Sequence, residues 1–106
     1  MSEHCLVLST VASEEDGERL ARTLVEKRVA ACVNVVPGVT SFYRWEGNVQ
    51  RGEERLLVIK TRADRFEDLR SALVELHPYD VPEVIAVPIT TGHGPYLSWL
   101  DESLSR

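Results

Sequence analysis

The stretch from Ala30 to Arg62 most constrains the fold of this 106-residue chain, because it predicts one long antiparallel hairpin. Two runs rich in valine, leucine, isoleucine and aromatic residues lie on either side of a turn, the second run covering residues 55–61. Glu46-Gly47-Asn48 has the composition of a hairpin turn, and Gly52 offers a second candidate. The first run is unusually long, so part of the hairpin is expected to project beyond the body of the domain.

The Pro37-Gly38 pair interrupts the first run, which predicts a bulge or kink at that point. Before the hairpin, residues 4–12 are apolar and β-rich and predict a buried strand. A helix follows through about residue 28, with Ser13 and Asp16 in the pattern of an N-terminal cap. Lys27 and Arg28 are expected in its last turn, where cations interact favourably with the helix dipole.

A second helix is predicted to begin at Asp64, which forms another cap pattern with Glu67. It must stop at His77, because the residue before a proline is excluded from the helical region. Residues 84–90 predict the fourth strand.

Pro88 cannot donate a hydrogen bond to a neighbouring strand, so the fourth strand should lie at a sheet edge or Pro88 near its end. Pro95 is suited to the first turn of a short final helix. The side chains expected to face inward on that helix are Tyr96, Leu97, Leu100 and Leu104.

The predicted order is β-α-β-β-α-β followed by a C-terminal helix, in one domain over residues 1–106. Right-handed crossovers make this an α+β, ferredoxin-like sandwich with the first two helices on one face of an antiparallel sheet. The other face would be bare in a monomer. A bare face and a protruding hairpin together predict an oligomer.

Composition excludes several classes of protein. The formal net charge of −5, with acids and bases mixed along the chain, argues against a nucleic-acid partner. No apolar run approaches the roughly 18 residues needed to span a bilayer, and the N-terminal stretch lacks the features of a secretory signal. Cys5 and Cys32 are too few for a disulfide framework. We therefore expect a cytoplasmic location and no membrane partner.

Three segments, AACVNVVPG, SFYRWEG and HPYDVPE, together resemble the CutA divalent-cation tolerance proteins, and the similarity spans nearly the whole chain. Asp80 stands where many members carry glutamate, which keeps the charge. The resemblance implies a homotrimer of ferredoxin-like subunits, similar in architecture to the P-II signalling proteins, whose long hairpins reach across to neighbouring subunits. It also implies an association with copper or another divalent cation.

The resemblance implies a metal role for Cys32, whose soft thiolate would suit Cu(I). The alternative is a small buried strand residue, since free cysteine is commonly buried. His77 could ligate a divalent metal through a neutral imidazole, or could simply be a histidine at a helix C-terminus. Asp80 and Glu83 are oxygen ligands in principle, although such acids alone are more often solvated or salt-bridged.

The resemblance also implies that Lys60 lines a cleft between subunits, where it could pair with Glu83 or hold an anion. Asn34 and Tyr79 are assigned to the same cleft, Tyr79 being a packing residue first. Tyr43 and Trp45 are expected to anchor the trimer interface, because aromatic residues supply large buried area at such contacts.

The hypothesis that follows is a cytoplasmic CutA-like homotrimer that binds copper or another divalent ion weakly. One alternative is a P-II-like sensing or signalling trimer, which would hold an anionic metabolite with Lys60 and Arg62 and have no metal function. A third is a purely structural trimer without a ligand. The sequence contains no nucleophile-base pattern, P-loop, C-x-x-C or H-E-x-x-H motif, so an enzyme is not expected.

Overall fold

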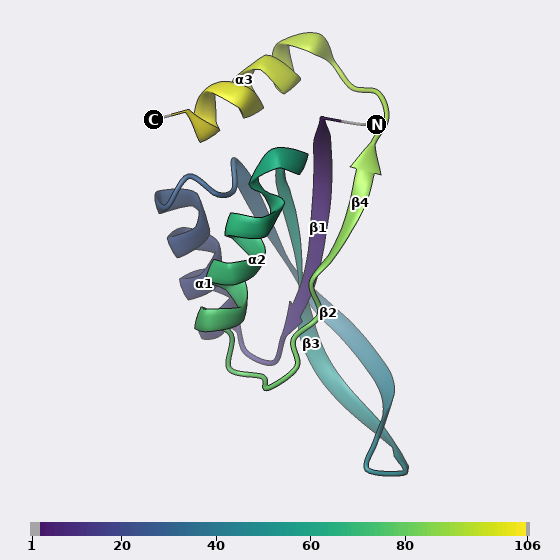
Figure 1. Cartoon of the computed structure of the whole chain (residues 1–106). Coiled ribbons are helices and arrows are strands. Elements are labelled where there is room, and N and C mark those ends of the chain that lie inside the picture. Colours follow the sequence, from purple (N-terminus) through teal and green to yellow (C-terminus); the bar gives the residue numbers. More distant parts are fainter. Residues whose placement is uncertain (1–2, 106) are drawn as a thin grey trace.

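The computed structural model describes residues 3–105, which form four strands and three α-helices (Figure 1). The elements are β1 (His4–Val11), α1 (Glu14–Glu26), β2 (Cys32–Trp45), β3 (Asn48–Arg62), α2 (Phe66–Leu76), β4 (Ile85–Ile89) and α3 (Gly94–Leu104). A single 3-10 turn, Ala63–Arg65, joins β3 to α2.

All strand pairs are antiparallel, and the order in the sheet is β2-β3-β1-β4. The two β-α-β units therefore interlock, because β1 lies between β3 and β4. Helices α1 and α2 lie side by side on one face of the sheet, and α3 lies across one end (Figure 1). The predicted α+β architecture with an antiparallel sheet is confirmed.

The core lies between this sheet face and the two helices. Side chains alternate along β1, with Cys5, Val7, Ser9 and Val11 buried toward the helices and the residues between them only half-buried. They pack with buried side chains from the neighbouring elements, which are Leu20, Leu24, Leu57, Ile59, Leu69 and Leu73. Among residues 3–105, no helix covers the opposite face of the sheet along most of its length (Figure 1).

The hairpin of β2 and β3 projects beyond the rest of the chain, as predicted, and extends the molecule to 45 × 25 × 23 Å (Figure 1). Glu46 and Gly47 form its turn with φ values of 50° and 81°, which suit the twist of a two-residue hairpin. The pairing register shifts between Val36 and Val39, so the bulge predicted at Pro37-Gly38 is confirmed. The second strand of the hairpin, β3, begins at Asn48, well before the predicted start at residue 55.

The first helix begins as predicted, because the Asp16 backbone N–H donates to the Ser13 hydroxyl oxygen at 3.1 Å. It ends earlier than predicted, at Glu26, so Lys27 and Arg28 lie beyond its last turn. Arg28 has a φ of 59° and its guanidinium donates to the Ser103 carbonyl at 3.2 Å, which ties α1 to α3.

The predicted cap at Asp64 is wrong. The Arg62 guanidinium donates to the Asp64 carboxylate at 3.2 Å, and the chain makes a 3-10 turn before α2 begins at Phe66. The arginine competes for the carboxylate that the cap would have required. The end of the helix is as predicted, since His77 is extended before Pro78.

The fourth strand lies at the sheet edge, as Pro88 predicted, and is one residue shorter at each end than expected. Leu100 and Leu104 of α3 are buried with Ala31, whereas Tyr96 is 42% exposed. The expectation that Tyr96 faces inward is therefore wrong, because α3 covers only the end of the sheet.

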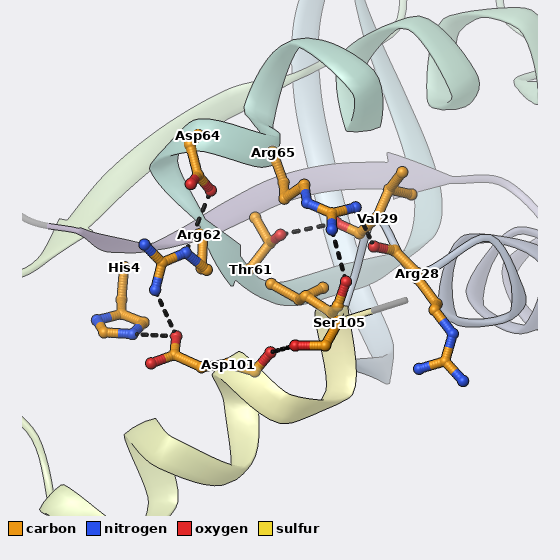
Figure 2. Close-up of polar contacts among 10 residues, drawn as sticks. His4, Arg28, Val29, Thr61, Arg62, Asp64, Arg65, Asp101 and Ser105 are labelled. Carbon is orange, nitrogen blue, oxygen red and sulfur yellow. Dashed lines mark hydrogen bonds and ion pairs between the residues drawn. The ribbon is translucent and has the colours of Figure 1, made fainter.

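Asp101 links α3 to β1 and β3 (Figure 2). Its carboxylate accepts from the Arg62 guanidinium at 2.7 Å and lies 2.9 Å from Nε2 of His4. The hydrogen bond from Arg62, followed by that from His4, lowers the pKa of Asp101. Nearby, Arg65 donates to the Leu104 carbonyl at 2.6 Å, so several polar contacts hold a helix that buries few side chains.

We expect Asp101→Asn to lower the free energy of unfolding at pH 7 by about 0.5 kcal/mol, since the side chain is 41% exposed and such ion pairs contribute little. A carboxyl with a depressed folded-state pKa stabilises above its unfolded pKa, near 4. That stability is lost as the pH falls through the folded value. Urea denaturation at pH 7 and below about pH 3 should show the difference shrinking in acid. Glu102→Gln, at an exposed carboxyl on the same helix, is the matched control; an effect equal to that of Asp101→Asn would contradict the prediction.

The core contains two buried hydroxyls in different situations. Thr61 donates to the Val29 carbonyl at 2.7 Å, whereas the Ser9 hydroxyl is fully buried and has no hydrogen-bond partner among the described residues. We expect Ser9→Ala to stabilise the protein by about 1 kcal/mol, because an unpaired buried polar group is removed. The melting temperature should rise by about 4–8 °C at fixed protein concentration. Thr61→Val should instead lower it, and a loss of stability in Ser9→Ala would refute the account.

Candidate functional site

The segment from His77 to Val84 leaves α2 and leads into β4, and His77 fixes its start. The His77 ring is largely buried, with Nε2 2.9 Å from the Thr10 carbonyl and Nδ1 accepting from the Tyr79 backbone N–H at 3.1 Å. A carbonyl only accepts and an N–H only donates, so Nε2 carries the proton and Nδ1 is unprotonated. Burial lowers the pKa of His77, which agrees with this neutral form.

Tyr79 continues the same arrangement. Its ring packs against the His77 ring with centroids 4.7 Å apart, and its hydroxyl donates to the Glu54 carboxylate at 2.7 Å. Burial, followed by the contact with Glu54, raises the pKa of Tyr79 well above its usual value. The contact joins the connecting segment to β3 and holds the Glu54 carboxylate in one place.

A cavity of about 750 Å³ lies between this segment and the hairpin. The residues that line it are Thr10, Ser41, Phe42, Tyr43, Trp45, Glu54, Pro78, Tyr79, Asp80, Val81 and Glu83. Four of them are aromatic and three are acidic. No lysine or arginine of the described chain is among them, so the cavity is suited to a cation.

A second cluster lies at the other end of the sheet. Cys32 on β2 faces Lys60 on β3, whose ammonium lies 3.9 Å from the Cys32 sulfur and hydrogen-bonds the Asn34 side-chain oxygen. Burial, followed by contact with Cys32, raises the pKa of Tyr96. The ammonium of Lys60 beside the thiol would repel a metal cation and would favour an anionic partner.

The structure divides the four predicted metal ligands. Asp80 and Glu83 line the cavity, and His77 lies beside it with both ring nitrogens engaged. Cys32 belongs to the Lys60 cluster, and Lys60 lies six residues along β3 from Glu54, a separation of about 20 Å. Within residues 3–105, no group of three or more His, Cys, Asp or Glu side chains is placed to hold a metal ion.

The three residues predicted to line a cleft between subunits also lie in two places. Lys60 and Asn34 lie together beside Cys32, and Tyr79 lines the cavity. Tyr43 and Trp45 are 50% and 53% exposed and line the cavity, and their interface role stays a prediction. Sequence reasoning missed Glu54, because no motif marks it and its partner Tyr79 lies 25 residues away in the sequence.

The part of the chain that the structure describes contains no helix long and apolar enough to cross a membrane.

Comparison with known proteins gives consistent results. The family described as "CutA1 divalent ion tolerance protein" matches residues 5–103. The chain is 51% identical over 98 residues to the "Divalent-cation tolerance protein CutA" of Thermus thermophilus, covering 92% of this chain and 95% of that protein. It is also 51% identical to the "Protein CutA, chloroplastic" of Arabidopsis thaliana, but it spans only 54% of that longer protein.

Solved structures of similar proteins have the same fold. The crystal structure of CutA from Xylella fastidiosa superimposes with a TM-score of 0.95 at 38% identity, over 98% of this chain and all of that one. The Thermus thermophilus structure superimposes with a TM-score of 0.92 at 50% identity, over 94% of this chain and 97% of that one. From the family match, the sequence identity and the shared fold, this chain belongs to the CutA1 divalent ion tolerance protein family.

Proposed function

We propose that the protein acts in divalent-cation tolerance, as a homotrimer of ferredoxin-like subunits that binds copper or another divalent cation weakly. The observation that carries this proposal is membership of the CutA1 family across residues 5–103. The relatives from Thermus thermophilus and Archaeoglobus fulgidus are both named divalent-cation tolerance proteins.

Exposed apolar surface supports association into an oligomer. Phe42, Trp45 and Val49 on the hairpin are 68%, 53% and 67% exposed, and Ile85 on β4 is 51% exposed. Large apolar side chains this exposed are typical of surfaces that contact another chain. The number of three subunits follows from the family resemblance.

Metal binding is best supported at Asp80 and Glu83, which bring carboxylates to the cavity. His77 would first have to give up two hydrogen bonds, and Cys32 lies beside the ammonium of Lys60. One chain does not bring three ligands together within the described residues. The remaining ligands in this proposal are therefore water or side chains of a second copy, which agrees with weak binding.

The P-II-like alternative has less support. Arg62, which would hold an anionic metabolite, already pairs with Asp64 and Asp101, and Lys60 pairs with Asn34. The purely structural trimer remains the outcome if no ligand binds. The cytoplasmic location stays a prediction, because relatives include a protein named chloroplastic and one whose structure is titled periplasmic.

Calorimetric titration with Cu(II), in buffer without reducing agent, tests the metal proposal. We expect Asp80→Asn combined with Glu83→Gln to weaken binding about tenfold, since two oxygen ligands are lost, which is about 1.4 kcal/mol. Glu102→Gln removes one exposed carboxylate elsewhere and should leave the affinity unchanged. Wild-type protein that binds no Cu(II) at millimolar concentration would refute a metal function, and an unchanged isotherm in the double variant would refute the ligand assignment.

Sedimentation velocity tests the oligomer. Wild-type protein is expected to sediment as a trimer, and Trp45→Ala should shift it toward smaller species because a large interface side chain is lost. Val25→Ala is the matched control, since Val25 is 41% exposed on α1, in the helix layer. A wild-type monomer would contradict the proposed assembly.

A further inference from the structure

The sheet is apolar on both faces, although α1 and α2 cover only one of them. Val7 and Ile59 are buried toward the helices, and side chains alternate along a strand, so the register defines the opposite, open face. Its apolar side chains are Leu6, Leu8, Leu56, Val58, Ile85 and Val87. An apolar sheet face is normally buried against another layer. In the proposed oligomer, a second copy of the chain supplies that layer.

Lys60 is the one charged side chain in this apolar area. The register aligns residues 6, 8 and 10 of β1 with their neighbours on the other strands, and Lys60 is the only charged residue in these three rows. Its row also contains Cys32, and the next row contains Asn34. The ammonium hydrogen-bonds the Asn34 side-chain oxygen and lies 3.9 Å from the Cys32 sulfur. A small polar cluster therefore interrupts the open face near the edge strand β2.

The charge of Lys60 is not neutralised within the chain. Among residues 3–105, no carboxylate forms an ion pair with it. Arg62, the next cation on the same side of β3, pairs with both Asp64 and Asp101. Asn34 holds the Lys60 ammonium with a neutral oxygen only. Covering the open face would therefore bring an uncompensated positive charge against the covering layer.

This charge and the apolar side chains around it have different effects on association. Apolar contact is non-directional, so a purely apolar face allows copies to meet in several arrangements. An ammonium that loses water without gaining an acceptor costs free energy. Arrangements that cover Lys60 with apolar side chains are disfavoured, and those that leave the ammonium in contact with water or an acceptor oxygen are not. A single polar side chain in an apolar contact fixes the register and the subunit number of coiled coils in this way.

We propose that Lys60, held by Asn34, determines which arrangement of subunits forms, by excluding those in which the apolar face of another copy covers its ammonium. The inference rests on the proposed oligomer and adds a residue that sets its specificity. The apolar side chains of the open face supply the affinity, and Lys60 supplies the discrimination between arrangements.

Native mass spectrometry of the full-length protein tests the proposal. Lys60→Met replaces the lysine with an apolar side chain of similar length. We expect one subunit number in the wild-type protein and at least one further subunit number in Lys60→Met. The population of the further species should rise about tenfold over wild type, which corresponds to removal of a penalty of about 1.4 kcal/mol. Sedimentation velocity at several protein concentrations should show the same mixture.

Three further variants serve as controls. Lys60→Arg keeps the positive charge and should give the single species of the wild type. Leu56→Met changes an apolar side chain on the same face with little change in volume, and should also give a single species. Lys60→Gln removes the charge but stays polar and soluble, so it should show the further species even where Lys60→Met precipitates. Circular dichroism checks that each variant is folded.

The outcomes separate this inference from the proposed trimer. A Lys60→Met protein with only the wild-type subunit number would overturn the inference, and so would a monomeric one, which would make Lys60 an attractive contact. An equal mixture in Leu56→Met would also overturn it. A wild-type oligomer of another subunit number, with a mixture in Lys60→Met, would refute the trimer alone. A wild-type monomer would refute both.

Discussion

The burial of one sheet face against α1 and α2 is the interaction on which the rest of this structure depends. Leu20, Leu24, Leu69 and Leu73 are completely buried there, and each such side chain contributes about 1.5–3 kcal/mol. Exposed ion pairs such as those of Asp101 contribute less than about 1 kcal/mol each. Because both helices cover the same face, the other face of the sheet and the hairpin are left uncovered by them (Figure 1).

The second constraint is the connection from α2 to β4. Pro78 forces His77 out of the helix, and the buried neutral imidazole then binds the backbone on both sides, at Thr10 and at Tyr79. This arrangement makes His77 a structural residue that shapes the cavity wall. His77, one of the four predicted metal ligands, therefore holds the start of the segment that carries Asp80 and Glu83.

The Cys32 thiol and the cavity carboxylates lie at opposite ends of the sheet. The thiol of Cys32 lies beside the ammonium of Lys60, and the Glu54 carboxylate lies at the cavity, about 20 Å away along β3. A single ion cannot use both ends within one chain. Family membership describes a relation to divalent ions, and the two ends of the sheet offer chemically different groups.

Sequence alone determined the elements and their order, since periodicity, turn residues and prolines act locally. The bulge at Pro37-Gly38, the hairpin turn and the helix end before Pro78 were all predictable for this reason. Local patterns failed at Asp64, because the carboxylate was taken by Arg62. The site was decided only by the tertiary structure, which separates Cys32 from His77 and brings Glu54 to Tyr79. Residues distant in sequence meet through strand register and packing, and neither is visible in a motif.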